Sequence, residues 1–375
     1  MKKRNWAQRS AAILCLILVL GSARGDAQEP AADLPAPGAR AAVLIDGASG
    51  RLLYGSSEHK QLPMASTTKV MTALLALESC SLQETVTASR RASGVPGTSI
   101  YLREGERLTM EEMLLGLMLR SGNDAAVAIA EHVSGSVEAF AQRMNERAQE
   151  LGAQANFVTP NGLDAGGHSI SALGLALVAR QAMTLPDFRR IVGTQKATIP
   201  WPGNDFDRVL TNKNRLLREY EGATGIKTGF TSKAGRCLVF SAEREGMELI
   251  GVVLNCGTWF DSAEKLLDWG FAHYSLAEAA RAGEVAARAA IHGGEEKSVE
   301  LRAESDVAAA VCEGDAWRVL LEVDELRAPV RAGQVCGRIA LEVNGEVLAQ
   351  SDLLAAREVA RRDFWAALRR VFRRF

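Results

Sequence analysis

The sequence has almost no net charge: 44 Lys and Arg residues oppose 45 Asp and Glu residues, which leaves a formal net charge of −1 over 375 residues. Proteins that act mainly on nucleic acid usually carry a strong basic excess, so we expect no nucleic-acid partner. The length allows a large domain and a smaller one, and a hydrophobic fraction of 47% is ordinary for a packed protein.

Closely spaced cysteines are also lacking. The six cysteines include no Cys-x-x-Cys pair and form no Cys/His cluster along the sequence, so we expect no metal site. Cys312 and Cys336 lie in one late segment and could pair in an oxidising compartment. The other three beyond the N-terminal segment are expected to be small buried residues: Cys80, Cys237 and Cys256.

The Gly-x-Ser-x-Gly motif, which carries the nucleophile of many Ser-His-Asp hydrolases, is absent. The five histidines are isolated in the sequence, and isolated histidines usually lie on surfaces or helices. We assign no chemistry to them, including His168 in "DAGGHSIS". A Ser-His-Asp mechanism is therefore not favoured.

The N-terminal apolar run, "AAILCLILVL" from Ala11 to Leu20, is too short to span a bilayer comfortably. Small residues follow it, and four basic residues precede it: Lys2, Lys3, Arg4 and Arg9. This pattern is typical of a secretory signal peptide. We therefore expect residues 1–27 to be an export signal and the mature protein, from about Gln28, to work outside the cytoplasm.

Residues 28–275 show the order of an α+β domain. Two strands joined by an Asp-Gly turn are expected in "AAVLIDGASGRLLYG". Strands return in "RCLVFSAERE" and "MELIGVVLNC", and they would close the same sheet as the first pair. Helical periodicity is found at 66–78, 109–120, 124–135, 137–152 and 261–272.

Two further segments follow. Residues 276–352 have short strand patterns, frequent glycine and an Asn344-Gly345 hairpin signal, so we expect a small all-β domain. Residues 353–375 place aromatic and aliphatic side chains at helical spacing with arginines opposite them, which is typical of an amphipathic helix at a membrane interface. A helix docked on its own domain is the alternative, but it would not need so many arginines.

The pattern Ser-x-x-Lys occurs three times, and context separates the three. Ser57/Lys60 lies in a polar loop, and Ser262/Lys265 opens a helix where serine is an ordinary cap. Ser66 is placed where an apolar helix begins, and Lys69 lies three positions on, on the same face. Burial and nearby positive charge would lower the pKa of Lys69 and make it a base for the Ser66 hydroxyl.

Two tripeptides accompany this pair. Ser121-Gly122-Asn123 lies in the expected turn between two helices, and Lys227-Thr228-Gly229 lies on an expected edge strand. Each alone is weak, because the first is an ordinary helix–helix turn and the second an ordinary strand end. The set Ser-x-x-Lys, Ser-x-Asn and Lys-Thr-Gly, in this order, is that of penicillin-binding proteins and class A β-lactamases.

With these motifs the chain resembles the low-molecular-mass penicillin-binding proteins that act as serine-type D-alanyl-D-alanine carboxypeptidases. The resemblance extends to "GTSIYLREGERLTMEEMLLGLMLRSGNDAAVAIAEHVSG", "NFVTPNGLDAGGHSIS" and "TNKNRLL". It also covers the later β segment and the basic C-terminal segment. It implies a β-lactamase/transpeptidase-like catalytic domain, an all-β domain and a membrane-anchoring helix.

The resemblance implies roles for the catalytic residues. Ser66 would attack the carbonyl between the two terminal D-alanines of a peptidoglycan stem peptide, and Lys69 would accept its proton. Ser121 would relay a proton toward the leaving amine. β-Lactam antibiotics would acylate the same serine. No metal or organic cofactor is implied.

It also implies substrate-binding residues. Asn123 would bind the substrate's amide, while Lys227 and Thr228 would face its terminal carboxylate beside Gly229. The backbone N–H groups of Ser66 and Phe230 would stabilise the oxyanion. The enzyme would act at the outer face of the cytoplasmic membrane, held there by its C-terminal helix.

Two departures from the family pattern are visible. Phe230 stands where some members have histidine, and Lys213 stands where some have arginine, which unlike lysine can clamp a carboxylate bidentately. A β-lactamase is the nearest competing interpretation, although no Glu-x-x-Leu-Asn context is present between the second and third motifs. An endopeptidase is also compatible with the motifs. An envelope binding module that only holds peptide or β-lactam would be favoured if Lys69 or Ser121 were missing, and both are present.

Overall fold

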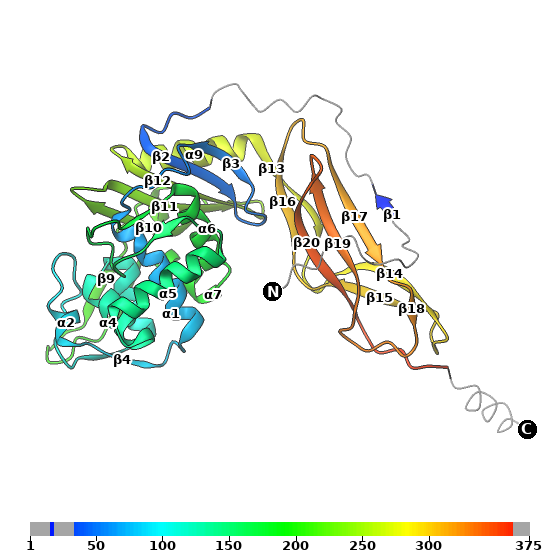
Figure 1. Ribbon diagram of the computed structural model, residues 1–375, viewed down its shortest axis with the longest axis horizontal. Coiled ribbons are helices and arrows are strands. Elements are labelled where there is room, and N and C mark those ends of the chain that lie inside the picture. Colours follow the sequence, from blue (N-terminus) through cyan, green and yellow to red (C-terminus); the bar gives the residue numbers. More distant parts are fainter. Residues whose placement is uncertain (1–15, 19–33, 363–375) are drawn as a thin grey trace, which may run out of the picture. The chain divides into compact units, whose positions relative to one another are not determined.

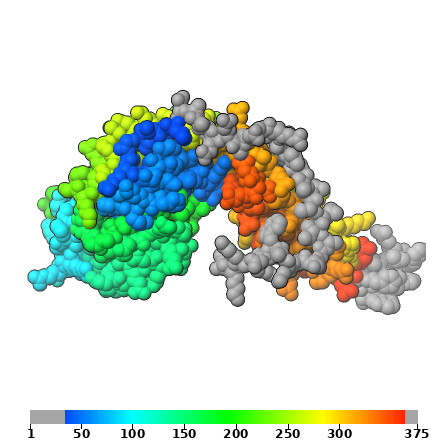
Figure 2. Space-filling model, turned by 45° about the horizontal axis from the view of Figure 1, so that its top comes forward, coloured from blue at the N-terminus to red at the C-terminus, as the bar shows by residue number. Residues whose placement is uncertain are grey.

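The computed structural model describes residues 16–18 and 34–362. The chain divides into two compact units, one of Pro30–His273 and one that combines Met1–Glu29 with Tyr274–Phe375. The surface of the first unit is built from segments spread along its whole length, from the blue residues near 50 to the yellow-green residues near 260 (Figure 2).

A five-stranded antiparallel sheet organises the first unit, in the order β10-β11-β12-β2-β3. The predicted Asp-Gly hairpin is confirmed as β2 and β3, and the Lys-Thr-Gly segment lies on edge strand β10 as predicted. The strands are β2 (Ala39–Asp46), β3 (Leu52–Ser56), β10 (Ala223–Thr231), β11 (Gly235–Arg244) and β12 (Met247–Cys256).

The central strands are buried on both faces. Alternate side chains of a strand point to opposite faces, so Val239 joins the core of the helical block while Leu44 and Leu249 meet Gly270 of α9. This explains why β11 and β12 are almost continuously apolar. The helices that lie along the sheet are α6 (Ala172–Met183) and α9 (Trp259–His273) (Figure 1).

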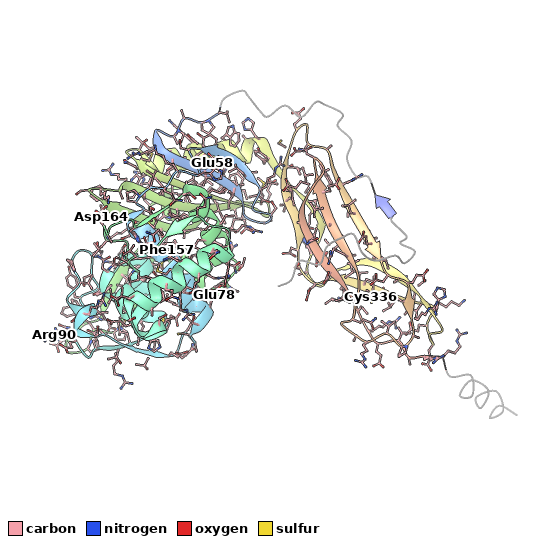
Figure 3. All side chains as sticks on the ribbon, viewed as in Figure 1. Glu58, Glu78, Arg90, Phe157, Asp164 and Cys336 are labelled. Carbon is pink, nitrogen blue, oxygen red and sulfur yellow. The ribbon has the colours of Figure 1, made fainter. Side chains whose placement is uncertain are left out.

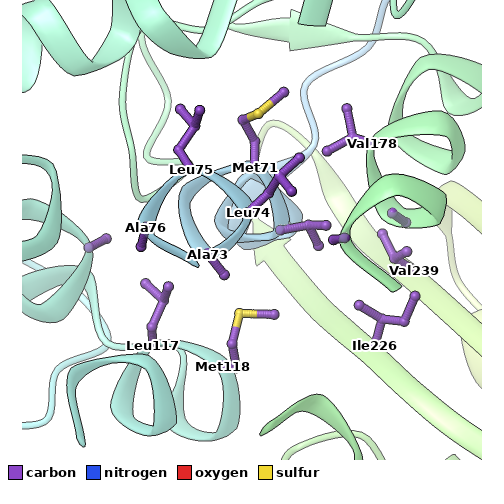
Figure 4. Close-up of a cluster of buried hydrophobic side chains, with 14 of the residues drawn as sticks. Met71, Ala73, Leu74, Leu75, Ala76, Leu117, Met118, Val178, Ile226 and Val239 are labelled. Carbon is purple, nitrogen blue, oxygen red and sulfur yellow. The ribbon is translucent and has the colours of Figure 1, made fainter. Parts of the chain in front are cut away.

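The helical block packs around α1 (Figure 4). Its apolar residues Met71, Leu74 and Leu75 are buried against side chains that include Met118 and Val178. The predicted helices are present as η1 (Ala65–Thr68), α1 (Lys69–Ser79), α3 (Met110–Leu115), η2 (Gly116–Arg120), α4 (Asn123–Ser134) and α5 (Val137–Glu150).

A capping box begins α3: the Thr109 side chain accepts from the Glu112 backbone N–H, and the Glu112 side chain accepts from the Thr109 backbone N–H. This reciprocal pair sets the start of the segment that leads to Ser121. Shorter elements complete the unit: β4 (Thr85–Thr87), α2 (Arg90–Ser93), β5 (Arg107–Thr109), β6 (Ala155–Asn156), β7 (Ser169–Ile170), α7 (Pro186–Gly193), β8 (Lys196–Ile199), β9 (Arg208–Thr211) and α8 (Leu216–Glu219).

The second unit is all-β in its described residues. It holds a seven-stranded sheet in the order β1-β17-β19-β20-β15-β14-β18 and the pair β13-β16. The predicted turn at Asn344-Gly345 joins β19 to β20. The strands are β1 (Leu16–Leu18), β13 (Tyr274–Ala280), β14 (Val285–His292), β15 (Ser298–Ala303), β16 (Val307–Cys312), β17 (Trp317–Val323), β18 (Leu326–Arg327), β19 (Val335–Val343) and β20 (Glu346–Ala355).

One expectation about this unit is corrected. A helix that starts at residue 353 is wrong, because β20 continues to Ala355, pairs with β15, and is followed by a bridge between Val330 and Val359. Residues 363–375 lie outside the described part of the chain. Cys312 and Cys336, whose pairing the sequence left open, are not joined to each other by a disulfide.

Candidate active site

Ser66 lies in the 3₁₀ turn that leads into α1. The turn is closed by Thr67, whose backbone N–H and hydroxyl both donate to the Met64 carbonyl, at 3.3 and 2.6 Å. Ala65 adopts a φ of +49°, a left-handed conformation that is costly for a residue with a side chain. Ser66 is partly exposed while both its neighbours are buried. The hydroxyl is therefore accessible on an otherwise buried turn.

Lys69 is fully buried and contacts three oxygens. Its Nζ lies 3.0 Å from Ser66 Oγ, 2.8 Å from Asn123 Oδ1 and 2.5 Å from the Asn161 carbonyl. The Asn123 and Asn161 oxygens can only accept, so each takes one N–H of the amine. A neutral lysine has two N–H bonds and one lone pair. Its lone pair is therefore left for the Ser66 hydroxyl.

The surroundings of Lys69 favour this neutral form. Burial holds its pKa well below the ordinary value, and the positive charges of Lys227 and Lys213 act in the same direction. Asp124 opposes them as the smallest contribution. The predicted serine and lysine thus form a hydrogen-bonded pair in which the amine can serve as a base.

The Ser121-Gly122-Asn123 turn positions the third partner. Ser121 is buried and has a φ of +67°, and the Gly122 N–H donates to the Gly116 carbonyl at 3.1 Å. Asn123 Nδ2 donates to the Pro96 carbonyl at 2.8 Å, which turns Oδ1 toward Lys69. Among the hydrogen bonds of residues 34–362, none joins the Ser121 hydroxyl to Lys69 or Lys227.

The Lys-Thr-Gly strand borders the same site. Lys227 is buried and donates to the Thr228 carbonyl at 3.1 Å, and burial, aided by Lys213, lowers its pKa to about 7. Gly229 allows the strand to approach the turn that carries Ser66, because a Cβ there would lie 2.9 Å from the Ser66 nitrogen. Phe230 is 64% exposed.

Sequence reasoning missed a segment that supports the site. The Asn161 carbonyl holds Lys69, and the Pro160 carbonyl accepts from Thr72 Oγ1 at 2.6 Å. Gly162 has a φ of +83°, and a Cβ there would lie 1.9 Å from the Ala65 carbonyl oxygen, so only glycine fits. The Asn161-Gly162 dipeptide is an ordinary turn signal that could have marked this segment, but it does not say which residues the turn contacts.

His168 is a further supporting residue. Its Nδ1 accepts from the Val158 backbone N–H at 2.9 Å, so its proton lies on Nε2 and is donated to Thr68 Oγ1, also at 2.9 Å. Thr68 Oγ1 in turn donates to the Ala65 carbonyl at 2.8 Å. Burial lowers the pKa of His168 to about 4. A neutral histidine therefore braces the turn that holds Ser66.

The remaining two Ser-x-x-Lys matches carry no such arrangement. The Lys60 backbone N–H closes a turn on the Ser57 carbonyl. The Ser262 hydroxyl is buried and donates to the Pro37 carbonyl at 2.6 Å, while Lys265 is exposed. Both therefore behave as chance matches, although Ser262 lies inside α9 and is not its cap as expected.

An α+β fold in which a serine contacts a buried lysine beside a Lys-Thr-Gly edge strand is the arrangement of serine acyl-transfer enzymes of the penicillin-binding class. Comparisons with known proteins agree. Residues 27–258 match the family model described as D-alanyl-D-alanine carboxypeptidase, and residues 274–361 match that of the penicillin-binding protein 5 C-terminal domain.

Relatives and solved structures cover most of the chain. It is 33% identical over 345 residues to the D-alanyl-D-alanine carboxypeptidase DacF of Bacillus subtilis, with 88% of each chain covered. It is 31% identical over 361 residues to DacC of Escherichia coli, with 90% of this chain and 88% of that one covered. Penicillin-binding protein 5 from Haemophilus influenzae superposes with a TM-score of 0.68 at 30% identity, over 88% of this chain and 99% of that one.

The chain therefore belongs to the D-alanyl-D-alanine carboxypeptidase family. The predicted penicillin-binding fold and the predicted enzyme class, a serine-type DD-carboxypeptidase of peptidoglycan metabolism, are both confirmed.

Proposed function

We propose that Ser66 is the nucleophile and Lys69 its general base. The observation that carries this proposal is the contact of Lys69 Nζ with Ser66 Oγ at 3.0 Å, with two carbonyl-type oxygens on the remaining N–H positions. Ser66 Oγ bonds to the carbonyl carbon between the terminal D-alanines as its proton passes to Lys69. The C–N bond then breaks, the terminal D-alanine leaves as an amine, and water hydrolyses the acyl-enzyme ester.

The substrate's terminal carboxylate lies against the Lys-Thr-Gly strand in this proposal. Protonated Lys227 supplies the charge and Thr228 a hydroxyl. The close approach of Gly229 to the Ser66 turn brings the backbone of Phe230 near that of Ser66, which supports an oxyanion site made of these two N–H groups. Lys213, which acts on the pKa of Lys227, adds positive charge at this end.

Ser121 and Asn123 complete the proposed machinery. We assign to Ser121 the transfer of a proton to the leaving amine. Ser121 lies buried in the turn that also carries Asn123, whose side chain contacts Lys69. Asn123 binds the amide of the substrate through the side chain that also orients Lys69.

Hydrolysis of a peptide acyl-enzyme is favoured over rapid β-lactam turnover. In the described part of the chain, the hydrogen-bond partners of Ser66 and Lys69 are side-chain amide, hydroxyl and backbone oxygens, and none is a carboxylate. Class A β-lactamases use a glutamate to activate water for deacylation. We therefore propose slow release of β-lactam adducts and faster release of peptide products.

The test is the mass of the protein after exposure to benzylpenicillin. We expect one covalent adduct, and peptide mapping should place it on Ser66. Ser66→Ala should form no adduct, whereas Ser262→Ala, which changes a serine in a chance Ser-x-x-Lys match, should be modified like wild type. An adduct on another residue would overturn the assignment.

We further propose that the protein is exported through residues 1–27 and binds membranes through its basic C-terminal segment, residues 363–375. Within the described residues, no helix is both long and apolar enough to cross a membrane. The full mature chain should co-sediment with vesicles that contain anionic lipid, whereas a chain ending at Arg362 should not. Less of the full mature chain should co-sediment with neutral vesicles. Equal sedimentation of both chains would contradict the anchor.

A further inference from the structure

Three side chains of metal-ligating chemistry meet outside the active site. They are Cys80, which caps the C-terminus of α1, Glu84, which precedes β4, and His132, in the last turn of α4. Their ligand atoms all lie within 4.8 Å of one another. The cluster is at the end of α1 marked by Glu78 in Figure 3, opposite the end that begins with Lys69.

The carboxylate is already oriented toward the other two groups. The Ser81 backbone N–H donates to Glu84 Oε1 at 2.6 Å, which leaves Oε2 3.3 Å from His132 Nε2. Cys80 is a half-buried free thiol, while Glu84 and His132 reach the surface. An ion in solution could therefore reach all three groups, and a backbone N–H already fixes one ligand as outer-shell partners do in metal sites.

The charges around the cluster also suit a cation. The Glu84 carboxylate brings a negative charge to the cluster, and among the described residues its ion-pair partner is His132, at 3.3 Å. The guanidinium of Arg143 is already engaged elsewhere, because it donates to Val133 O, Ser134 Oγ and Ser79 Oγ at 3.2, 3.4 and 2.9 Å. Two helices, α1 and α4, end here, and helix C-termini carry partial negative charge.

The three donors match the preferences of Zn²⁺. Zinc binds thiolate, imidazole and carboxylate at about 2.0–2.3 Å in tetrahedral geometry, which places ligand atoms roughly 3.4–3.8 Å apart. The ligand atoms of the three side chains, which now lie within 4.8 Å of one another, can reach this spacing by small side-chain rotations. A thiolate and a carboxylate together would balance the two positive charges of the ion.

We propose that Cys80, Glu84 and His132 form a zinc site, with water as the fourth ligand. On binding, the thiol proton is released to solvent and the ion bridges the ends of α1 and α4. These helices carry Lys69 and Asn123 at their opposite ends. The α1 helix is about 16 Å long at 1.5 Å per residue, so the ion would be too far from Ser66 to touch the substrate. Its effect is on the stability of the helical block.

The experiment is a titration of the chelator-treated full mature chain with Zn²⁺, followed by competition with a chromophoric chelator, and with Co²⁺ as a spectroscopic probe. We expect one equivalent of Zn²⁺ to bind, Co²⁺ to develop a thiolate charge-transfer band, and the unfolding midpoint to rise with zinc concentration. Cys80→Ser and His132→Ala should each weaken zinc binding at least tenfold and abolish the rise. Cys312→Ser, which removes a half-buried thiol from the other unit, should behave like wild type.

The result that would overturn the site is absence of saturable zinc binding by wild type, or equal binding by Cys80→Ser. The unfolding midpoints of the metal-free variants show whether each variant is folded. Cys80→Ser replaces a single atom, so this variant still tests the site if His132→Ala does not fold. D-alanine release should be the same in wild type, Cys80→Ser and Cys312→Ser without metal. This separates the zinc site from the catalytic proposal.

Discussion

A methyl group on Gly229 would lie 2.9 Å from the backbone nitrogen of Ser66. It would also lie 3.0 Å from the nitrogen of Thr67 and 3.1 Å from the carbonyl oxygen of Met64. All three atoms belong to the backbone of the turn that carries Ser66, so they cannot move aside as a flexible side chain would. The edge strand can lie this close to the turn only because Gly229 has no side chain.

Gly229→Ala should therefore separate β10 from the Ser66 turn and disturb the proposed oxyanion site. We expect the rate of acylation by benzylpenicillin to fall at least tenfold, about 1.4 kcal/mol of transition-state stabilisation. Gly257→Ala is the matched control, because a Cβ at Gly257 meets no atom within 4 Å. Equal acylation rates for both variants would mean that the close approach has no catalytic role.

Lys213→Ala should move the pH profile of kcat/KM to higher pH. The positive charge of Lys213 lowers the pKa of both Lys69 and Lys227, so its removal raises both values. On the acid limb of the profile Lys69 must lose its proton, and on the alkaline limb Lys227, with a pKa of about 7, must keep its proton. Both limbs should therefore move to higher pH. The measurement is D-alanine release from a soluble peptide between pH 5 and 10.

The control for this shift is Lys297→Ala, which removes the same charge from the other unit. Its profile should overlay that of wild type. A Lys213→Ala profile that falls in height but stays at the same pH would show that Lys213 binds substrate without tuning the two lysines.

His168 should make the fold sensitive to acid. Its pKa in the folded protein is lowered to about 4 from 6.5, so the unfolded chain takes up a proton first as the pH falls. The contribution of neutral His168 to the free energy of unfolding is fully present above pH 6.5. It is lost as the pH falls toward 4, which lowers that free energy by up to about 3 kcal/mol. Denaturant unfolding of the wild type and of His168→Asn at pH 4 and pH 7 should show a smaller pH dependence in the variant.

His59→Asn serves as the reference, since the His59 side chain is 66% exposed and contacts only Glu58 among the ion pairs of the described residues. It should keep the pH dependence of wild type. If His168→Asn keeps it as well, the acid sensitivity comes from another group.

The features that the sequence predicted depend on short-range patterns. The helix that carries Ser66 and Lys69 follows from apolar spacing, and three residues along one face bring the two side chains within reach. The sheet strands follow from continuous apolar runs, and the edge position of Lys-Thr-Gly from the motif set. Each apolar pattern, and each motif of the set taken singly, is contained in a few consecutive residues.

What was missed depends on residues far apart in the chain. The Asn161 carbonyl contacts Lys69 across 92 residues, and His168 contacts Thr68 across 100. His132 meets Glu84 across 48 residues, a contact that the spacing of cysteines and histidines along the sequence does not indicate. The wrong helix start at residue 353 has a similar cause, because Leu353 is buried by pairing with Ala303 of β15, and that pairing overrides the helical spacing.

The most direct test of the catalytic account is D-alanine release from a soluble peptide ending in D-Ala-D-Ala, with protein that lacks residues 1–27 and its Ser66→Ala variant. We expect release by the wild type and none above background by Ser66→Ala, with both proteins folded by circular dichroism. Release by Ser66→Ala at the wild-type rate would contradict the assignment of Ser66 as the nucleophile.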